Sequence, residues 1–423
     1  MLNLRILILT LQLLAPLPVL LAKRLLKLTA PKTEVIITLK IRMLTLTIVR
    51  TRTMLVPMLE DLVFPEIVFF KVVQLCVQRL LIYPKRYPVH IKMQKAWFYE
   101  VHGPKEVLKL GDFPIPYPVQ NQLLVQVRAA ALNPIDFKLR CNPLVFTDFP
   151  VVPGCDMAGI VVGKGDHVSR FEVGDEVYGN IQNFNAKGEF KQLGTLAQFI
   201  VVEENLVASK PNNLSFEEAA SLPVAVQTAV EGFKTAGFKE GQTIFIVGGA
   251  GGVGTLAVQL AKQLYRASLV AATTSTAKVE FLKTLGADEV VDYTKTRYEE
   301  VKKKYDLVYD TIGESKNSYV VAKDGAPVID ITWPPSNPRA VHSSLTVSGE
   351  ILETLRPCLE SGKLTAVIDP AGPFHFCDVI KAFEYLETGR ARGKVVISPF
   401  SAPYLTSEFC NSKLVPQRSF IGC

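Results

Sequence analysis

Three glycines, Gly249, Gly251 and Gly254, have the spacing GxGxxG and directly follow the apolar run 243–247. In such a loop we expect Gly249 to make the tight turn, Gly251 to let backbone N–H groups approach a phosphate, and Gly254 to let a helix pack closely on a sheet. Apolar residues then recur with helical spacing over residues 253–264, which predicts an amphipathic helix whose N-terminus faces a negative charge. The order of strand, glycines and helix predicts a binding site for a dinucleotide pyrophosphate rather than a plain glycine-rich loop.

The segment after the next predicted strand, 269–272, indicates which dinucleotide the site binds. A site for NAD places a carboxylate on the ribose 2′-OH about 20 residues beyond the glycines, but residues 273–278 contain no Asp or Glu. They contain hydroxyl groups and one ammonium group instead, which attract a 2′-phosphate through hydrogen bonds and charge. The segment concerned is Ser275, Thr276, Ala277 and Lys278, in which Ser275 and Thr276 carry the hydroxyl groups and Lys278 the ammonium group. They favour NADPH over NADH, and the alternative role of Lys278 is a solvated charge on the next helix.

The elements that must position these residues change in character along the chain. From Met93 onward, short β-branched runs separated by Pro and Gly turns predict an antiparallel, barrel-like module. After about Ser221, strands alternate with helices, which is typical of a parallel, doubly wound sheet. The predicted strands are 95–99, 108–110, 122–130 and 159–162 in the first module and 243–247, 269–272, 289–291, 305–309 and 327–331 in the second. Two helical stretches, 351–361 and 379–386, precede a closing strand, 394–397.

The first 92 residues differ from the rest of the chain. They contain 14 Lys and Arg against 4 Asp and Glu, and they lack both Gly and Ser, although a globular stretch of this length needs glycine at several turns. Residues 1–22 are mostly Leu and Ile and are followed by Lys23-Arg24, as in a signal peptide or a membrane anchor. A transit peptide is expected to be rich in Ser, and this segment is not. Three interpretations stay open: translated sequence upstream of a true initiator at Met93, a targeting or membrane-associating segment, and a packed domain.

Composition limits the function classes. The 423 residues are 48% hydrophobic and 21% charged, which is a globular composition with room for two or three domains. The formal net charge of +7 arises in residues 1–92, because residues 93–423 carry 33 Lys and Arg against 36 Asp and Glu. Such a slightly acidic remainder argues against nucleic-acid binding. Seven cysteines without a CxxC pair predict free thiols in a reducing compartment.

Seven short motifs follow one another in a characteristic order. The first is Asn133-Pro134-Ile135-Asp136, the last is Gly393-Lys394-Val395-Val396, and the others lie in 153–159, 173–179, 249–254, 286–293 and 306–310. Together they resemble the medium-chain dehydrogenase/reductase superfamily, in its zinc-free quinone oxidoreductase branch. They are most similar to the plant enone oxidoreductases, also called 2-methylene-furan-3-one reductases or alkenal/one oxidoreductases. The resemblance covers about residues 93–400.

This resemblance implies an α/β fold class with two domains. A GroES-like antiparallel β-barrel catalytic domain is expected beside a doubly wound parallel Rossmann domain. The expected boundaries are 1–92 for an atypical basic and apolar extension, 93–220 for the GroES-like domain, 221–350 for the Rossmann NADP-binding domain, 351–400 for a return to the catalytic domain and 401–423 for a tail.

The resemblance also implies roles for individual residues. Lys138 is expected beside the nicotinamide ribose and the substrate oxygen, with a surface lysine after a turn as the alternative, and Asn133 is expected to orient the substrate or the nicotinamide. Cofactor contacts are expected from Gly249, Gly251, Gly252, Val253 and Gly254 at the pyrophosphate, from Ser275, Thr276, Ala277 and Lys278 at the 2′-phosphate, from Tyr293 at the adenosine side, and from Gly393 and Lys394 where the chain returns to the nicotinamide. The alternative for Tyr293 is an aromatic side chain that is simply packed.

No metal is expected. Zinc-dependent relatives carry a Cys near the position of Asn133 and a His in a GHE motif, where this chain has Cys155-Asp156. Zinc needs three or four converging ligands, and without this Lewis acid the direct reduction of a carbonyl group is disfavoured. Hydride addition to the β-carbon of an enone is different, because the developing enolate needs only modest stabilisation by hydrogen bonds.

The resemblance therefore implies an NADPH-dependent reductase of the C=C bond of α,β-unsaturated carbonyl compounds. Its partner is expected to be a small-molecule enone, alkenal or quinone. A quinone reductase and a non-catalytic NADPH-binding or membrane-associated accessory protein stay open as alternatives. We expect a monomer or homodimer in the cytoplasm, with the plastid, at its envelope, as the alternative location.

Overall fold

The structure is a computed structural model that describes residues 92–143, 149–181 and 193–400. The predicted extension up to residue 91 and the predicted tail 401–423 lie outside the described residues. In the described ranges, no helix is both long and apolar enough to cross a membrane. These ranges all belong to one compact unit, which begins at Ile91.

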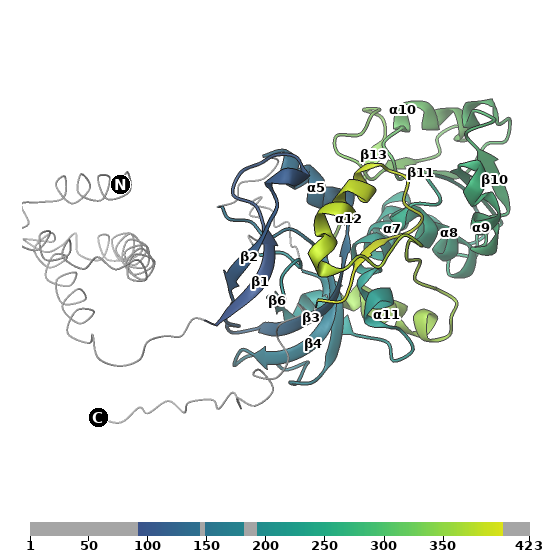
Figure 1. Cartoon of the computed structure of the whole chain (residues 1–423). Helices are drawn as coiled ribbons and strands as arrows, with labels where there is room; N and C mark the ends of the chain where they lie inside the picture. The colour runs from purple at the N-terminus through teal and green to yellow at the C-terminus, as the bar shows by residue number, and fades with distance from the viewer. Residues whose placement is uncertain (1–91, 144–148, 182–192, 401–423) are drawn as a thin grey trace, which may run out of the picture. The chain divides into compact units, whose positions relative to one another are not determined.

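A six-stranded parallel sheet forms one half of this unit (Figure 1). Its strands are β8 (Thr243–Val247), β9 (Leu269–Thr274), β10 (Glu289–Asp292), β11 (Leu307–Asp310), β12 (Val328–Asp330) and β13 (Val341–His342). Their order in the sheet is β10-β9-β8-β11-β12-β13. This is the doubly wound order of dinucleotide-binding sheets, and it confirms the predicted Rossmann topology. Successive strands are added in one direction from β8 to β10 and in the opposite direction from β11 to β13, and such sheets bind ligands at this switch point between β8 and β11.

Alternating side chains of β8 show why this strand is buried on both faces. Ile244 and Ile246 belong to one hydrophobic cluster, whereas Phe245 and Val247 belong to another. Side chains of successive strand residues point to opposite faces of a sheet, so one run of five residues serves both clusters. Helices α7 (Pro223–Ala236) and α8 (Gly252–Gln263) contribute their apolar faces to the first cluster.

The second sheet is antiparallel. It contains β3 (Gln122–Leu132), β4 (Asp156–Lys164), β5 (Glu176–Asn180), β6 (Phe199–Glu203), β7 (Val207–Ser209) and β14 (Val395–Ile397). Their order is β14-β3-β4-β5-β7, with β6 also paired to β3. A separate antiparallel pair is formed by β1 (Met93–Phe98) and β2 (Lys109–Pro114). Because β14 pairs with β3, the chain returns to the first sheet after the parallel sheet, as predicted.

Four further helices or short helical elements matter for the site. They are α5 (Pro134–Cys141), α9 (Val279–Thr284), α11 (Gly349–Glu360) and α12 (Val379–Glu387). Helix α5 begins with Pro134, whose fixed φ suits the first helical position. It follows β3 directly, so the motif that begins at Asn133 lies where a strand of the antiparallel sheet ends.

Candidate functional site

The glycine loop between β8 and α8 begins with a residue in the left-handed region of backbone conformation. Gly248 has φ +80°, and its N–H donates to Thr273 Oγ1 over 2.9 Å. At Gly249, φ is not in the left-handed region, and an added Cβ would lie 2.7 Å from Ala272 Cβ. Gly249 lies in a tight turn, as predicted, because the N–H of Gly251 donates to Gly248 O over 3.2 Å. Gly248 supplies the positive φ before it, and the absence of a side chain at Gly249 lets the loop approach β9.

The predicted role of Gly254 is confirmed. A Cβ there would lie 2.2 Å from Gly248 O and 2.8 Å from Gly249 Cα, so the helix could not stay this close to the loop. Gly251 differs, because an added Cβ would have only Gly248 O nearby, at 3.5 Å. No neighbouring residue excludes a side chain there, and the space that a side chain would fill is the space a phosphate group needs.

The start of α8 is left without a side-chain cap, since its N-cap residue is Gly251. The first N–H groups of a helix have no partner inside the helix, and the N-terminus carries partial positive charge. The open space at Gly251 and these N–H groups together suit a pyrophosphate. The loop therefore fits the dinucleotide predicted from the sequence, and contacts of its phosphates with Gly252, Val253 and Gly254 stay a prediction.

The return segment 393–394 lies against this loop. The N–H of Gly393 donates to Ala250 O over 2.9 Å, and Gly393 has φ +79°. An added Cβ on Gly393 would lie 2.3 Å from Val367 O, so this position requires glycine for conformation and for space. The stem of Lys394 covers Gly252, because a Cβ on Gly252 would lie 2.9 Å from Lys394 Cδ.

The ammonium group of Lys394 is fully engaged inside the protein. Its Nζ donates to Leu132 O over 3.1 Å, to Asn133 Oδ1 over 2.5 Å and to Asp156 Oδ2 over 3.0 Å. Three acceptors match the three hydrogens of an ammonium group. The main-chain groups of Lys394 are also paired, with Val367 O and with the N–H of Asp369.

The side chain of Asn133 is buried and belongs to the same network. Its Oδ1 accepts from Lys394, and its Nδ2 donates to Asp156 Oδ2 over 2.8 Å. The second carboxylate oxygen of Asp156 accepts from the N–H of Val224, in the first turn of α7, over 2.8 Å. Burial raises the pKa of the Asp156 carboxyl group, and the Lys394 ammonium opposes this rise.

A second buried carboxylate, that of Asp136, lies beside this network. It accepts from the N–H of Asn133 over 2.7 Å and from Cys155 Sγ over 3.2 Å. Burial raises the pKa of Asp136 from 3.8 to about 6. Cys155 is 1% exposed and carries a free thiol, in agreement with the free thiols predicted from the cysteine pattern.

Lys138 differs from Lys394 in having no internal partner. It lies in the second turn of α5 and is half-buried. No described residue accepts a hydrogen bond from its ammonium group or forms an ion pair with it. The N-cap of its helix is Asn133, so the buried network fixes the base of the helix that carries Lys138. Its predicted contact with the ribose and the substrate oxygen stays a prediction.

The predicted adenosine end lies where β9 and β10 terminate. Ser275 follows β9, and its hydroxyl group forms no hydrogen bond with a described residue. Thr276 is exposed, but its Oγ1 donates to Asp292 Oδ2 over 2.6 Å. The hydroxyl groups of Thr276 and Thr294 lower the pKa of Asp292 to about 2. Asp292 lies in the motif 286–293, but no role was predicted for its carboxylate.

Lys278 connects this end of the sheet to the return segment. Its Nζ donates to Arg390 O over 2.6 Å and to Ala391 O over 3.1 Å. Burial lowers the pKa of Lys278. Two of its three N–H bonds are thus used inside the chain, and the predicted contact with a 2′-phosphate stays a prediction.

Two more residues occupy the same end. The N–H of Tyr293 donates to Thr274 O over 3.0 Å, which places Tyr293 beside Ser275, and its side chain is 59% exposed. The alternative of a packed aromatic side chain is therefore wrong. Arg392 was not singled out from the sequence, although it directly precedes Gly393. Its guanidinium group lies 4.8 Å from the centre of the Phe281 ring, and its Nε is buried without a partner among the described residues.

The structure thus brings the predicted residues into two groups. Asn133, Gly251, Gly252, Gly393 and Lys394 form one group together with Asp156, in which Gly251 and Gly252 are half-buried and the other members are buried. We call this group the junction. Asp156 was named in the motif 153–159 and beside the missing zinc ligand, but no role was predicted for it. Residues 275–278 and Tyr293 form an open edge, together with Asp292 and Arg392. Asp292 follows the predicted strand 289–291 directly, so strand position could have pointed to it. Asp156 lies before the predicted start of its strand at 159, and strand position gave no such signal there.

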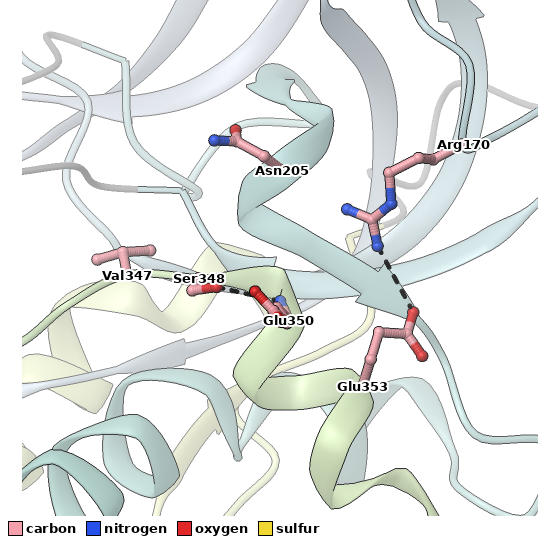
Figure 2. A pocket seen from close by; sticks show the side chains of 6 residues that line it. All are labelled: Arg170, Asn205, Val347, Ser348, Glu350 and Glu353. Atoms are coloured by element: carbon pink, nitrogen blue, oxygen red, sulfur yellow. Dashed lines mark hydrogen bonds and ion pairs between the residues drawn. The ribbon is translucent and has the colours of Figure 1, made fainter. Parts of the chain in front are cut away.

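A pocket at the start of α11 lies outside both groups. It is lined by Arg170, Asn205, Val347, Ser348, Glu350 and Glu353. In Figure 2, Arg170 and Glu353 face each other at 3.9 Å, and Ser348 Oγ accepts from the Glu350 N–H over 3.1 Å. None of the predicted site residues contributes to it. Among the described residues, no group of three or more His, Cys, Asp or Glu side chains is arranged to hold a metal ion.

The fold and the glycine loop define a two-module protein of the class that binds a nicotinamide dinucleotide. Residues 119–212 match the alcohol dehydrogenase GroES-like domain family, and residues 285–397 match the zinc-binding dehydrogenase family. The sequence is 50% identical over 308 residues to a 2-methylene-furan-3-one reductase of Solanum lycopersicum, with 72% of this chain and 79% of that protein covered. The chain belongs to the medium-chain dehydrogenase/reductase superfamily, in its quinone oxidoreductase branch.

Two further comparisons agree with this assignment. An NADPH-dependent alkenal/one oxidoreductase, chloroplastic, of Arabidopsis thaliana is 46% identical over 311 residues, which are 73% of this chain and 80% of that protein. The solved structure of a quinone oxidoreductase from Coxiella burnetii has a TM-score of 0.64 and 31% identity, and it covers 72% of this chain and 99% of its own.

Proposed function

We propose that the protein reduces the C=C bond of α,β-unsaturated carbonyl compounds with NADPH. The observation that carries this proposal is the 50% identity, over 308 residues, to a protein named 2-methylene-furan-3-one reductase. The second relative, at 46% identity, is named an NADPH-dependent alkenal/one oxidoreductase. When bound, NADPH supplies a hydride for the β-carbon of the conjugated substrate.

The chain's own residues then have three tasks. The N–H groups at the start of α8 bind the pyrophosphate, and Gly251 leaves room for it. Ser275, Lys278 and Tyr293 face the adenosine ribose and its 2′-phosphate, at the ends of β9 and β10. The junction fixes the position of the glycine loop relative to α5, and the burial of its polar groups excludes water from the space between the loop and α5.

Lys138 is the residue that we place next to the substrate oxygen. Its ammonium group has no described internal partner, so donation to an external oxygen breaks no existing bond. Negative charge accumulates on the substrate oxygen as the β-carbon is reduced, and a hydrogen bond from Lys138 strengthens as that charge appears. The proton for the α-carbon comes from water or through a relay that includes Lys138.

The buried residues of the junction are unsuited to this task. Asn133, Asp156 and Lys394 have each used their polar atoms on one another, and freeing one of them leaves a buried group unpaired. We therefore assign Asn133 and Lys394 to positioning rather than to direct contact with the substrate.

Quinone reduction is the second candidate. It is supported by a 32% identical relative of Arabidopsis thaliana named chloroplast envelope quinone oxidoreductase homolog. The two functions differ in product, because enone reduction gives a saturated ketone and quinone reduction gives a quinol.

A product assay with labelled cofactor decides between them. The purified full chain is incubated with 3-penten-2-one or with a benzoquinone and NADPH that carries deuterium at C4, and products are identified by mass spectrometry and NMR. We expect 2-pentanone with deuterium on the former β-carbon. An unsaturated alcohol, or NADPH oxidation with the quinone alone, would refute enone reduction.

We further propose that the substrate is a small molecule and that the chain acts as a monomer or homodimer. Its location is proposed to be the cytoplasm, with the plastid as the alternative suggested by relatives named chloroplastic. Microscopy of the full chain with a C-terminal fluorescent protein distinguishes the two locations.

A further inference from the structure

The pair formed by Asp156 and Lys394 is more deeply buried than the other ion pairs between described residues. The side chain of Lys394 is 5% exposed and that of Asp156 is 0% exposed. Removing two charges from water is costly, and a buried pair is weak evidence for stability because apolar residues of the same size often stabilise as well. The position of this pair is more informative than its energy.

The pair contacts four segments that are distant in sequence. Lys394 reaches the end of β3 through Leu132 O and Asn133 Oδ1, and its stem covers Gly252 at the start of α8. Asp156, the first residue of β4, accepts from the N–H of Val224 at the start of α7. The negative charge of Asp156 thus lies at a helix N-terminus, where the helix dipole stabilises it.

We propose that Asp156 and Lys394 form a positioning element that holds the glycine loop against the β3–α5 corner, with Asp156 as its previously unassigned member. The inference rests on the proposed function, in that the loop binds NADPH and α5 carries Lys138. The pair touches neither cofactor nor substrate. It acts through Gly252, Gly393 and Asn133, which fix the distance between the two binding surfaces.

The decisive variant is Lys394→Met, which keeps an unbranched stem over Gly252 but removes the ammonium group. We expect the dissociation constants of both NADPH and NADH to rise at least tenfold and by the same factor, because the pair lies at the loop and not at the 2′-phosphate. Cofactor binding is measured with the full chain and no substrate, by titration calorimetry. Asp156→Asn should have the same effect. The double variant should lose less binding free energy than the sum of the two single losses, because each single variant leaves one buried charge unpaired.

Lys210 provides a matched control. Its side chain is also 5% exposed, and its Nζ lies 3.1 Å from Glu176 Oε2, 3.1 Å from Pro211 O and 2.6 Å from Leu214 O. None of these partners belongs to the glycine loop. Lys210→Met should therefore lower the melting temperature while leaving both dissociation constants within twofold of the parent values.

Hydrogen exchange of the cofactor-free protein supplies a second readout. Lys394→Met should speed amide exchange in the segments 248–256 and 222–226, and Lys210→Met should not. If Lys394→Met does not fold, Asn133→Ala removes one acceptor of the ammonium group and should produce the same pattern with an affinity loss of about threefold. The proposal would be overturned if Lys394→Met lowered the melting temperature but left the dissociation constants of the cofactors and the rates of amide exchange unchanged. Neither readout needs an enone, so a parent protein that binds NADPH without reducing enones refutes the proposed function and leaves this test valid.

Discussion

The junction and the open edge both contain a lysine predicted to serve the same cofactor, yet their surroundings differ. At the junction, Lys394 has three buried acceptors, and its neighbours Asn133 and Asp156 are also saturated. At the edge, the Ser275 hydroxyl group has no described partner, and Tyr293 is 59% exposed. Buried polar groups that pair with one another are costly to separate, whereas exposed groups exchange water for a ligand at little cost. The buried side chains of the junction are therefore suited to hold a geometry, and we expect the exposed groups of the edge to bind the cofactor.

The largest expected effect separates two glycines of the same loop. Gly254→Ala should destabilise the protein by about 3 kcal/mol or more, because its Cβ would lie 2.2 Å from Gly248 O and backbone must move. Gly251→Ala should change the free energy of unfolding by less than about 0.5 kcal/mol but weaken NADPH binding. Urea unfolding and cofactor titration of both variants test this contrast. Equal loss of stability in the two variants would contradict the assignment of open space to Gly251.

The second prediction concerns the pH dependence of stability that arises from Asp136, whose carboxylate lies beside the junction. The pKa of Asp136 is raised by burial to about 6, so between about pH 4 and pH 6 the folded protein binds more protons than the unfolded chain. Its contribution to stability is present below pH 4 and is lost as the pH rises through 6. Asp136→Asn should remove this loss, and its stability relative to the parent should improve by roughly 3 kcal/mol between pH 4 and pH 7.

Urea unfolding of both proteins at several pH values measures this difference. The parent's remaining pH dependence includes Asp310, whose pKa burial also raises to about 6 and which the variant retains. A stability difference between parent and variant that does not change with pH would show that Asp136 is not the group that titrates.

Much of the parallel sheet could be predicted from the sequence. The strand 243–247 is found at the predicted bounds, because its side chains are apolar on both faces and glycines end it. Strand β4 was predicted to begin at residue 159, but it begins at Asp156, since a buried charge interrupts the apolar pattern while its backbone still pairs with Ala131. The short strands β5, β6 and β7 were not predicted, because pairing in the sheet and not local pattern defines them.

The site was harder to predict because sequence motifs do not show which polar atoms are already paired. The motif residues Asn133 and Lys394 looked like ligand-binding groups, but each finds its partners in a distant segment, more than 200 residues away for this pair. Asp156 could not be paired with Lys394 from spacing alone. The tight turn at Gly249 was predictable because it depends on local geometry. The close approach of Gly249 to Ala272 of β9 was not, because it depends on a contact between distant segments.

The third prediction tests Lys138. It lies close to Asn133 of the junction in sequence, but its ammonium group, like the Ser275 hydroxyl group of the edge, has no described hydrogen-bond partner. Lys138→Met should lower kcat about 100-fold, or about 2.7 kcal/mol in barrier, with a smaller change in NADPH affinity. Lys138→Arg should recover part of this loss because it keeps the charge. Steady-state kinetics at saturating NADPH measure the effect. A kcat within about twofold of the parent would leave Lys138 as a ribose-binding residue only.

The smallest predicted effect concerns Lys278 and distinguishes contact with the 2′-phosphate from a purely structural role in holding residues 390–391. Lys278→Glu should raise the KM for NADPH about tenfold, or about 1.4 kcal/mol, more than the KM for NADH, because attraction to a 2′-phosphate becomes repulsion. Lys278 also donates to Arg390 O and Ala391 O, so the substitution removes two internal hydrogen bonds as well.

Lys278→Met separates these two contributions. It loses the same internal hydrogen bonds without adding a negative charge. A rise in KM that is equal for NADPH and NADH in this variant therefore measures how much those bonds stabilise the return segment. If Lys278 reads the 2′-phosphate, the ratio of the two KM values shifts toward NADH in Lys278→Met and further in Lys278→Glu. An equal rise for both cofactors in both variants would instead give Lys278 the same positioning role as Lys394, and Ser275, Tyr293 and Arg392 would remain as the groups that select NADPH.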